Sequence, residues 1–232
     1  MPNWLSNLAP GRILRTVVAW RGSIVAPLGA GWENELAALR QTRRIVPLLM
    51  TDAAALQIQI CVRAARQLDG LMAEAGVLMG GSARLICEAK RDVPLHLFDV
   101  FETVQSASAS PCSPLEQSIR DHFKATHGTA DAVRRLLRAY PHVHLHPGVF
   151  PASVPPVLRA ARFSFVHLDM DLAESTREGL EFFYPRLVPG GMLVGDDYQD
   201  VFVRKAFTDY FRPYPETPIE LPWGQVLVVK QG

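Results

Sequence analysis

The sequence has few cysteines, almost no net charge and no long apolar run. Its three cysteines, Cys61, Cys87 and Cys112, lack the spacing of metal ligands and indicate free thiols in a reducing cytoplasm. A net charge of +1 gives no electrostatic reason to expect nucleic acid or an anionic membrane as a partner. No apolar run reaches the roughly 20 residues that a membrane-spanning helix requires. The sequence therefore predicts a cytoplasmic protein without nucleic-acid or membrane partners.

The 232 residues suffice for one α/β domain with a sizeable core and a small appendage. Residues 1–47 combine apolar side chains with Pro and Gly interruptions, which indicates a helical cap or oligomer contact. This apolar segment favours a homodimer or a larger homo-oligomer. The main domain is expected over 48–232. The long connection at 105–129 is interpreted as a lid over the site, and its alternative is a surface loop.

From residue 71 onward the pattern alternates between strands and helices. Apolar runs of strand length are predicted at 71–77, 95–100, 143–147, 163–170, 192–195, 218–221 and 225–230. Helices are predicted at 53–68, 82–90, 130–140, 154–160, 173–187 and 201–211, with Thr51 or Asp52 capping the first. Pro189-Gly190-Gly191 is expected to end the helix before it, and Pro222-Trp223-Gly224 to form a hairpin. The pattern predicts a doubly wound, mostly parallel Rossmann-like α/β sheet with an antiparallel C-terminal hairpin strand.

Four aspartates lie where two successive strands end. Asp169 and Asp171 follow one apolar run, and Asp196 and Asp197 follow the next. A right-handed crossover makes these strands parallel neighbours, so the carboxylates are expected at the sheet edge where open α/β sheets bind ligands. Converging carboxylates raise one another's pKa values unless a cation lies among them, and oxygen ligands suit Mg²⁺ before Mn²⁺ or Ca²⁺. The alternative is a set of solvated carboxylates that cap neighbouring helices.

A glycine-containing turn follows the first sheet strand and leads into a helix. It contains Glu74, Gly76, Gly80, Gly81 and Ser82. Glycine suits a backbone that passes close to a ligand, and a helix that starts at Ser82 offers free N–H groups to a carboxylate. The spacing differs from the dinucleotide fingerprint and favours a zwitterionic ligand. Asp99 ends the second strand, where its carboxylate can accept both hydroxyl hydrogens of a ribose.

The histidines give weaker signals. His167 alternates with Asp169 along one strand and is interpreted as a packed core histidine, with a role beside the metal ligands as the alternative. His122 and His127 lie in the predicted lid and are expected to be solvated, although either could reach an acceptor. Three further histidines share a strand face that imitates a zinc site, although a polar edge strand explains them better: His142, His144 and His146.

Several segments between about residues 47 and 212 match one family pattern. The most specific are His167-Leu168-Asp169-Met170-Asp171, Glu174-Ser175-Thr176, Phe183-Tyr184-Pro185 and Asp196-Asp197-Tyr198. The others are Leu49-Met50-Thr51-Asp52, the glycine turn from Glu74 to Ser82, Phe98-Asp99-Val100-Phe101-Glu102 and Gly148-Val149-Phe150-Pro151. With these segments the chain resembles the macrocin O-methyltransferase family. Its members are S-adenosylmethionine- and metal-dependent enzymes that methylate sugar hydroxyls on macrolide and related antibiotics.

The resemblance implies a class I methyltransferase sheet and a role for each matching residue. The metal, Mg²⁺ or Mn²⁺, would be held by Asp169, Asp196 and Asp197, while Asp171 matches the general base. The methionine part of S-adenosylmethionine would lie near Met50, Thr51, Glu74 and Gly76, and its ribose at Asp99. The other residues implied around the cofactor are Val77, Gly81, Ser82, Phe101, Thr129, Val149, Phe150 and Asp169.

The implied reaction is methyl transfer from S-adenosylmethionine to a hydroxyl of a small molecule, with a sugar on an antibiotic-like secondary metabolite as the expected acceptor. The family usually has tyrosine where this chain has Ala173, which leaves the acceptor open. A catechol-type phenolic acceptor fits the same metal chemistry. Asp169-Met170-Asp171 is also the D-x-D pattern of metal-dependent glycosyltransferases, which leaves Asp196 and Asp197 unexplained. A degenerate, non-catalytic scaffold is a third alternative.

Overall fold

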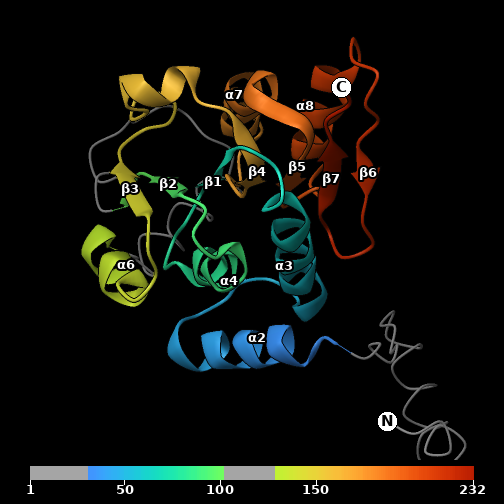
Figure 1. Cartoon of the computed structure of the whole chain (residues 1–232). Helices are drawn as coiled ribbons and strands as arrows, with labels where there is room; N and C mark the ends of the chain where they lie inside the picture. Colours follow the sequence, from blue (N-terminus) through green and yellow to red (C-terminus); the bar gives the residue numbers. More distant parts are fainter. Residues whose placement is uncertain (1–30, 102–128) are drawn as a thin grey trace, which may run out of the picture. The chain divides into compact units, whose positions relative to one another are not determined.

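The structure is a computed structural model that describes residues 31–101 and 129–232. Within it, Ala38–Gly232 form one compact unit built on a seven-stranded sheet (Figure 1). The predicted cap at 1–47 and lid at 105–129 lie largely outside the described residues, as do Cys112, His122 and His127. The domain boundary at residue 47 and the lid therefore remain predictions.

The sheet has the predicted doubly wound topology. Its strands are β1 (Leu71–Ala75), β2 (Leu95–Asp99), β3 (Val143–Pro147), β4 (Phe163–Leu168), β5 (Leu187–Gly195), β6 (Ile219–Glu220) and β7 (Val226–Val229). Their order is β3-β2-β1-β4-β5-β7-β6, with β1 to β5 parallel and β7 antiparallel to both of its neighbours. The chain steps outward from β1 to β3 and then returns to β4. The carboxyl ends of β1 and β4 therefore flank the switch point at which such sheets bind ligands.

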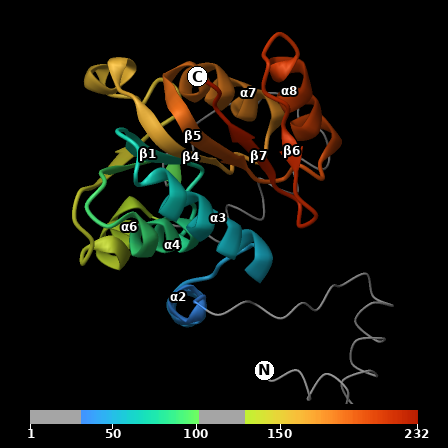
Figure 2. The same cartoon turned by 45° about the vertical axis from the view of Figure 1, so that its right-hand side comes forward.

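Helices cover both faces of the sheet (Figures 1 and 2). One layer contains α3 (Asp52–Ala65), α4 (Gly81–Lys90) and α6 (Ala130–Leu137), and the chain enters it from α2 (Glu33–Ile45). The other contains α7 (Ala173–Phe183), α8 (Val201–Phe211) and the 3₁₀ helix η3 (Pro156–Ala160). The sheet has a hydrophobic core on each face, and successive residues of β1 belong to different cores. Met72 is in one buried cluster with Ile58 of α3, and Ala73 is in another with Leu180 of α7. No helix in the described ranges is long and apolar enough to cross a membrane.

Local signals explain most of the element boundaries. Thr51 caps α3, since its hydroxyl accepts a hydrogen bond from Ala54 N at 3.2 Å. The strand at 143–147 and the helix at 201–211 have the predicted bounds. The hairpin before β7 is confirmed by the bond from Leu221 N to Gln225 O at 2.8 Å.

Two helix predictions need correction. The prediction that Pro189-Gly190-Gly191 ends the helix is wrong, because α7 ends at Phe183 and a 3₁₀ turn, η4 (Tyr184–Arg186), follows. Pro185 lacks the N–H that would continue the helical ladder. The Pro-Gly-Gly segment belongs to β5, where Gly190 N donates to Lys230 O at 2.8 Å. The helix predicted at 154–160 is only the 3₁₀ helix η3, which begins at a pair of prolines.

Candidate active site

The ends of β4 and β5 lie side by side and carry the four aspartates. The register pairs Leu168 with Gly195, and Asp196 N donates to Leu168 O at 2.8 Å. Asp169 N donates to Ala75 O at 2.9 Å, which joins this edge to the end of β1. All four carboxylate side chains are half-buried: Asp169, Asp171, Asp196 and Asp197. The cluster is therefore a place that a ligand can reach.

The aspartates are close enough to share a cation. In the described residues, possible ligand atoms lie within 4.8 Å of one another in two groups, His167–Asp169–Asp196 and Asp169–Asp171–Asp197. Asp169 belongs to both groups and is the centre of the cluster. The three residues that the sequence assigns to a metal do not form one such group: Asp196 is grouped with Asp169 and His167, and Asp197 is grouped with Asp169 and Asp171. Their oxygen-rich donor set fits Mg²⁺ or Mn²⁺.

Without a bound cation, repulsion among the carboxylates destabilises this cluster. Burial and the neighbouring Asp196 raise the pKa of Asp169 well above its ordinary value and also raise the pKa of Asp197. Burial and Asp197 raise the pKa of Asp171 to about 7. A carboxyl group with such a pKa can accept a proton near neutral pH, which suits a general base. The repulsion among these carboxylates therefore favours a bound cation at this site.

Two of the aspartates have unusual backbone conformations. Asp171 has φ 57° and Asp197 has φ 55°, in the left-handed region that most residues avoid. Aspartate tolerates this region better than most residues, but it still costs roughly 1 kcal/mol or more. Such strain often accompanies functional positions, and here it marks the proposed base and one predicted metal ligand.

The raised pKa of Asp171 predicts a pH-dependent stability difference. Because its folded pKa of about 7 exceeds the ordinary 3.8, the stability it contributes is complete below about pH 4 and lost as the pH rises through 7. Metal-free Asp171→Asn is therefore expected to be more stable than the wild type at about pH 8, by about 1–3 kcal/mol or roughly 3–10 °C in Tm, and to lose most of this advantage as the pH falls to about 4.

Thermal unfolding of both proteins at each pH, with EDTA present, checks this expectation. The comparison at equal pH cancels contributions from other groups, such as His96, whose pKa burial lowers to about 4. An Asp171→Asn protein that is less stable than the wild type at pH 8 would contradict the assignment.

His167 is both a packed core residue and a neighbour of the cluster. Its Nδ1 lies 2.7 Å from Glu74 Oε1, and neither side chain has any exposed surface. Its Nε2 lies 3.9 Å from Asp196 Oδ2, which is too long for a hydrogen bond. Burial alone would lower the pKa of His167, but the carboxylates of Asp196 and Glu74 raise it to about 10. Sequence reasoning missed this pair, which follows from the register that places Glu74 opposite His167.

The glycine turn passes directly over the start of the aspartate segment. Gly76 has φ +87°, and a Cβ atom there would lie 1.6 Å from the carbonyl oxygen of Asp169. The glycine is therefore required by the backbone crossing itself. Gly80, with φ +84°, precedes α4 as a cap without a side-chain hydrogen bond. The first N–H groups of α4 consequently remain available for an anionic group such as a carboxylate.

Asp99 holds the glycine turn in place. Its Oδ2 accepts hydrogen bonds from Val77 N at 2.6 Å and Leu78 N at 2.8 Å, and its Oδ1 accepts one from Phe101 N at 2.8 Å. Sequence reasoning assigned this carboxylate to a ribose and overlooked the backbone amides. A carboxylate has about four acceptor positions, so at least one remains for a hydroxyl group. Asp99 can thus order the turn and still contact a nucleoside.

Replacing Asp99 by asparagine is expected to weaken cofactor binding by about 10–100-fold, because hydrogen bonds to a charged group contribute about 1.5–3 kcal/mol each. Calorimetric titration with S-adenosylhomocysteine measures the effect. Asp209→Asn is the matched control, since Asp209 is a carboxylate on α8 that pairs with Arg212 on the surface. Equal affinity in Asp99→Asn and the control would contradict a role for Asp99 in this site.

The remaining residues predicted around a cofactor differ in their burial and in their contacts. The hydroxyls of Thr51 and Thr129 cap α3 and α6, accepting from Ala54 N and Ala132 N. Phe150 stacks on Phe183 at a centroid distance of 5.2 Å in the core. Met50 and Gly76 are half-buried, Val149 is exposed, and four others are buried: Val77, Gly81, Ser82 and Phe101.

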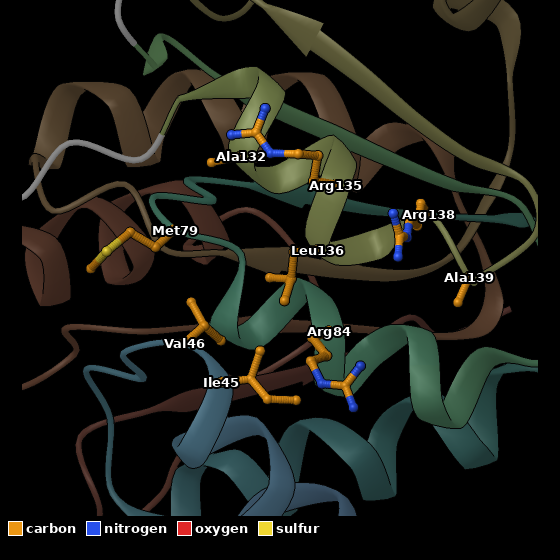
Figure 3. Close-up of a pocket in the computed structure, with 9 residues that line it drawn as sticks. All are labelled: Ile45, Val46, Met79, Arg84, Ala132, Arg135, Leu136, Arg138 and Ala139. Atoms are coloured by element: carbon orange, nitrogen blue, oxygen red, sulfur yellow. The ribbon is translucent and has the colours of Figure 1, made fainter.

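A separate hollow of about 610 Å³ lies between α4, α6 and the end of α2 (Figure 3). Its lining comes from α6, from Arg84 of α4, from Ile45 and Val46, and from Met79 in the glycine turn. None of the strand-end aspartates lines it. The hollow is therefore distinct from the place where the chemistry-bearing side chains meet.

The histidines of β3 lie on an edge strand, as predicted. His96 of β2, which sequence reasoning overlooked, stacks on His144 and has its Nδ1 3.0 Å from Nε2 of His146. These rings are absent from the close metal-ligand groups found among the described residues. The arrangement supports the interpretation of a polar edge over a zinc site.

Comparison with known proteins identifies the family. A family model described as Macrocin-O-methyltransferase (TylF) matches residues 48–223. A Streptomyces olivaceus protein named 8-demethyl-8-(2,3-dimethoxy-alpha-L-rhamnosyl)-tetracenomycin-C 4'-O-methyltransferase is 32% identical over 165 residues, which are 66% of this chain and 63% of that protein. The match thus spans less than two thirds of the relative's length.

Solved structures show the same fold. The O-methyltransferase NovP superimposes with a TM-score of 0.65 at 21% identity, covering 77% of this chain and 79% of its own. An O-methyltransferase from Bacillus cereus in complex with SAH has a TM-score of 0.56 at 15% identity, covering 94% and 99% of the two chains. The matched range spans the glycine turn, Asp99 and all four strand-end aspartates. From this match over most of its length, the chain belongs to the macrocin O-methyltransferase family.

Proposed function

We propose that this protein transfers the methyl group of S-adenosylmethionine to a hydroxyl of a small molecule, with a sugar on a secondary metabolite as the acceptor. The observation that carries the proposal is that Asp169, beside the glycine turn, is grouped with Asp196 and also with Asp171 and Asp197. The Streptomyces olivaceus relative, named for a rhamnosyl-tetracenomycin, supports a glycosylated acceptor.

In this proposal the cofactor lies over the carboxyl ends of β1 and β2. The free N–H groups at the start of α4 bind its carboxylate, and Asp99 accepts a hydroxyl of its ribose. Three further residues are assigned to the cofactor in this proposal, and none of them is fully buried: Met50, Gly76 and Val149. Bound there, S-adenosylmethionine supplies an electrophilic methyl group.

Asp169, Asp196 and Asp197 would hold a divalent cation, Mg²⁺ or Mn²⁺. Such a cation acidifies a coordinated hydroxyl group and neutralises developing negative charge. Asp171, on the same strand exit, takes the proton of the acceptor hydroxyl. In the metal-free protein, burial and the carboxylate of Asp197 raise the pKa of Asp171 to about 7.

The proposal is tested in two steps. Calorimetric titration of the full chain with S-adenosylhomocysteine, UDP-sugars and GDP-sugars first distinguishes a methyltransferase from a glycosyltransferase. Transfer of a radiolabelled methyl group is then measured with Mg²⁺ or Mn²⁺ over rhamnosylated aromatic polyketides, macrolides and catechols. We expect S-adenosylhomocysteine alone to bind and a glycosylated compound to be the best acceptor. Binding of a nucleotide sugar instead would overturn the proposal, and preferred methylation of catechols would assign the phenolic alternative.

A further inference from the structure

A buried polar pair lies behind the aspartates. Glu74 of β1 and His167 of β4 are direct neighbours in the parallel register, and both side chains are fully buried. A hydrogen bond of 2.7 Å joins Glu74 Oε1 to His167 Nδ1. Burying such groups is costly unless they are paired, so the bond strongly fixes the orientation of the imidazole ring.

The other ring nitrogen faces the aspartate cluster. His167 Nε2 is buried, has no hydrogen-bond partner and lies 3.9 Å from Asp196 Oδ2. The ring cannot turn away without breaking the buried bond to Glu74. Nε2 therefore stays directed at Asp196.

Two other groups contact the Asp196 carboxylate. Its Oδ1 accepts from Asp197 N at 3.2 Å, and its Oδ2 lies 3.5 Å from Nε2 of the fully buried Gln225. The first distance is at the upper end of the normal range for a hydrogen bond, and the second is beyond it. The fixed imidazole of His167 is thus one of three groups that face the Asp196 oxygens, and the only one of the three that is a possible cation at ion-pair distance.

We propose that His167 is a positioning residue for Asp196, and that Glu74 acts on the metal site through His167. The inference rests on the proposed function, in which Asp196 helps to hold a divalent cation. It gives Glu74 an indirect role in place of the direct cofactor contact expected from sequence, since Glu74 has no surface that a ligand can reach. Carboxylate–histidine pairs of this kind orient metal sites, and their loss typically costs about 10–100-fold in metal affinity.

The test measures Mn²⁺ affinity of the full chain by electron paramagnetic resonance, for the wild type, His167→Gln, Glu74→Gln and the double variant. We expect each single change to raise the Kd for Mn²⁺ by about 10–100-fold, and the double change to raise it no further, because the two residues act as one unit. The Kd for S-adenosylhomocysteine, measured by calorimetry, is expected to stay within about threefold of the wild type.

Ser164→Ala is the matched control. Ser164 is also fully buried on β4, and its hydroxyl bonds to Gly70 O at 3.3 Å, at the opposite end of the strand from the aspartates. This variant is expected to lose thermal stability and keep its Mn²⁺ affinity. A similar loss of Mn²⁺ affinity in Ser164→Ala would show a general effect of destabilisation and overturn the inference.

Glu74→Gln decides the matter even if His167→Gln does not fold. Unchanged Mn²⁺ affinity with weaker binding of S-adenosylhomocysteine would overturn the inference and assign Glu74 to the cofactor. A wild-type chain that binds neither probe would overturn the proposed function first, so the two failures can be told apart.

Discussion

Replacing Asp196 by alanine is expected to lower the rate of methyl transfer by about 10³-fold or more while cofactor binding is retained. Ligand atoms of Asp196, Asp169 and His167 lie within 4.8 Å of one another, so the substitution removes a carboxylate that is close to the centre of the cluster. The glycine turn follows β1, which is two strands away in the sheet. The effect should therefore fall on the chemical step and on metal affinity.

Methyl transfer to the best acceptor of the panel and calorimetric binding of S-adenosylhomocysteine measure the two quantities. Asp209→Ala, which removes an exposed carboxylate from α8, serves as the control and is expected to keep full activity. Excess EDTA should reproduce the loss in the wild type. Full turnover by Asp196→Ala, or by the wild type in EDTA, would contradict the metal assignment.

Replacing Gly76 by alanine is expected to destabilise the fold by about 2–5 kcal/mol and to abolish both cofactor and metal binding. Two effects add up at this position. The backbone has φ +87°, and the new Cβ would lie 1.6 Å from the carbonyl oxygen of Asp169. The chain can relieve the clash only by separating the turn from the aspartate segment. Denaturant unfolding and the two binding measurements report the result.

Gly190→Ala separates the two effects. Gly190 also has a positive φ, +77°, but a Cβ there would meet nothing closer than 3.7 Å. This control is expected to cost about 1–2 kcal/mol and to leave binding unchanged. If Gly76→Ala were as stable as Gly190→Ala and bound both ligands, the crossing of the two segments would not be as tight as the structure indicates.

The fold was largely predictable because its signals are local. Apolar runs of strand length alternate with helical spacing, and all seven predicted strands are present. The aspartate cluster was predictable because a crossover rule places the ends of β4 and β5 at one edge. The interpretation failed at 184–191, where Pro-Gly-Gly reads as a helix stop. There the long-range pairing with Lys230, which no local pattern reveals, makes the segment part of β5.

The supporting contacts of the site were not predictable for the same reason. The bond between Glu74 and His167 depends on the exact register of two strands that are 93 residues apart in sequence. The amides that bind Asp99 depend on the shape of the turn, including φ 50° at Leu78. Residue identity suggested a ligand for each of these side chains. Only the three-dimensional arrangement shows that other groups of the protein already form hydrogen bonds with them.

The hold of Asp99 on three backbone amides also bears on which donors the protein can accept. A turn anchored in this way loses its conformational freedom when the protein folds, and the proposed methyl donor therefore binds to a surface that is already ordered. Rigid surfaces discriminate sharply against altered shapes. Engineering this protein to transfer larger alkyl groups should therefore begin at residues outside the turn. Substitutions that loosen the backbone at Val77 and Leu78 would lower the affinity for the donor before they allowed larger donors to bind.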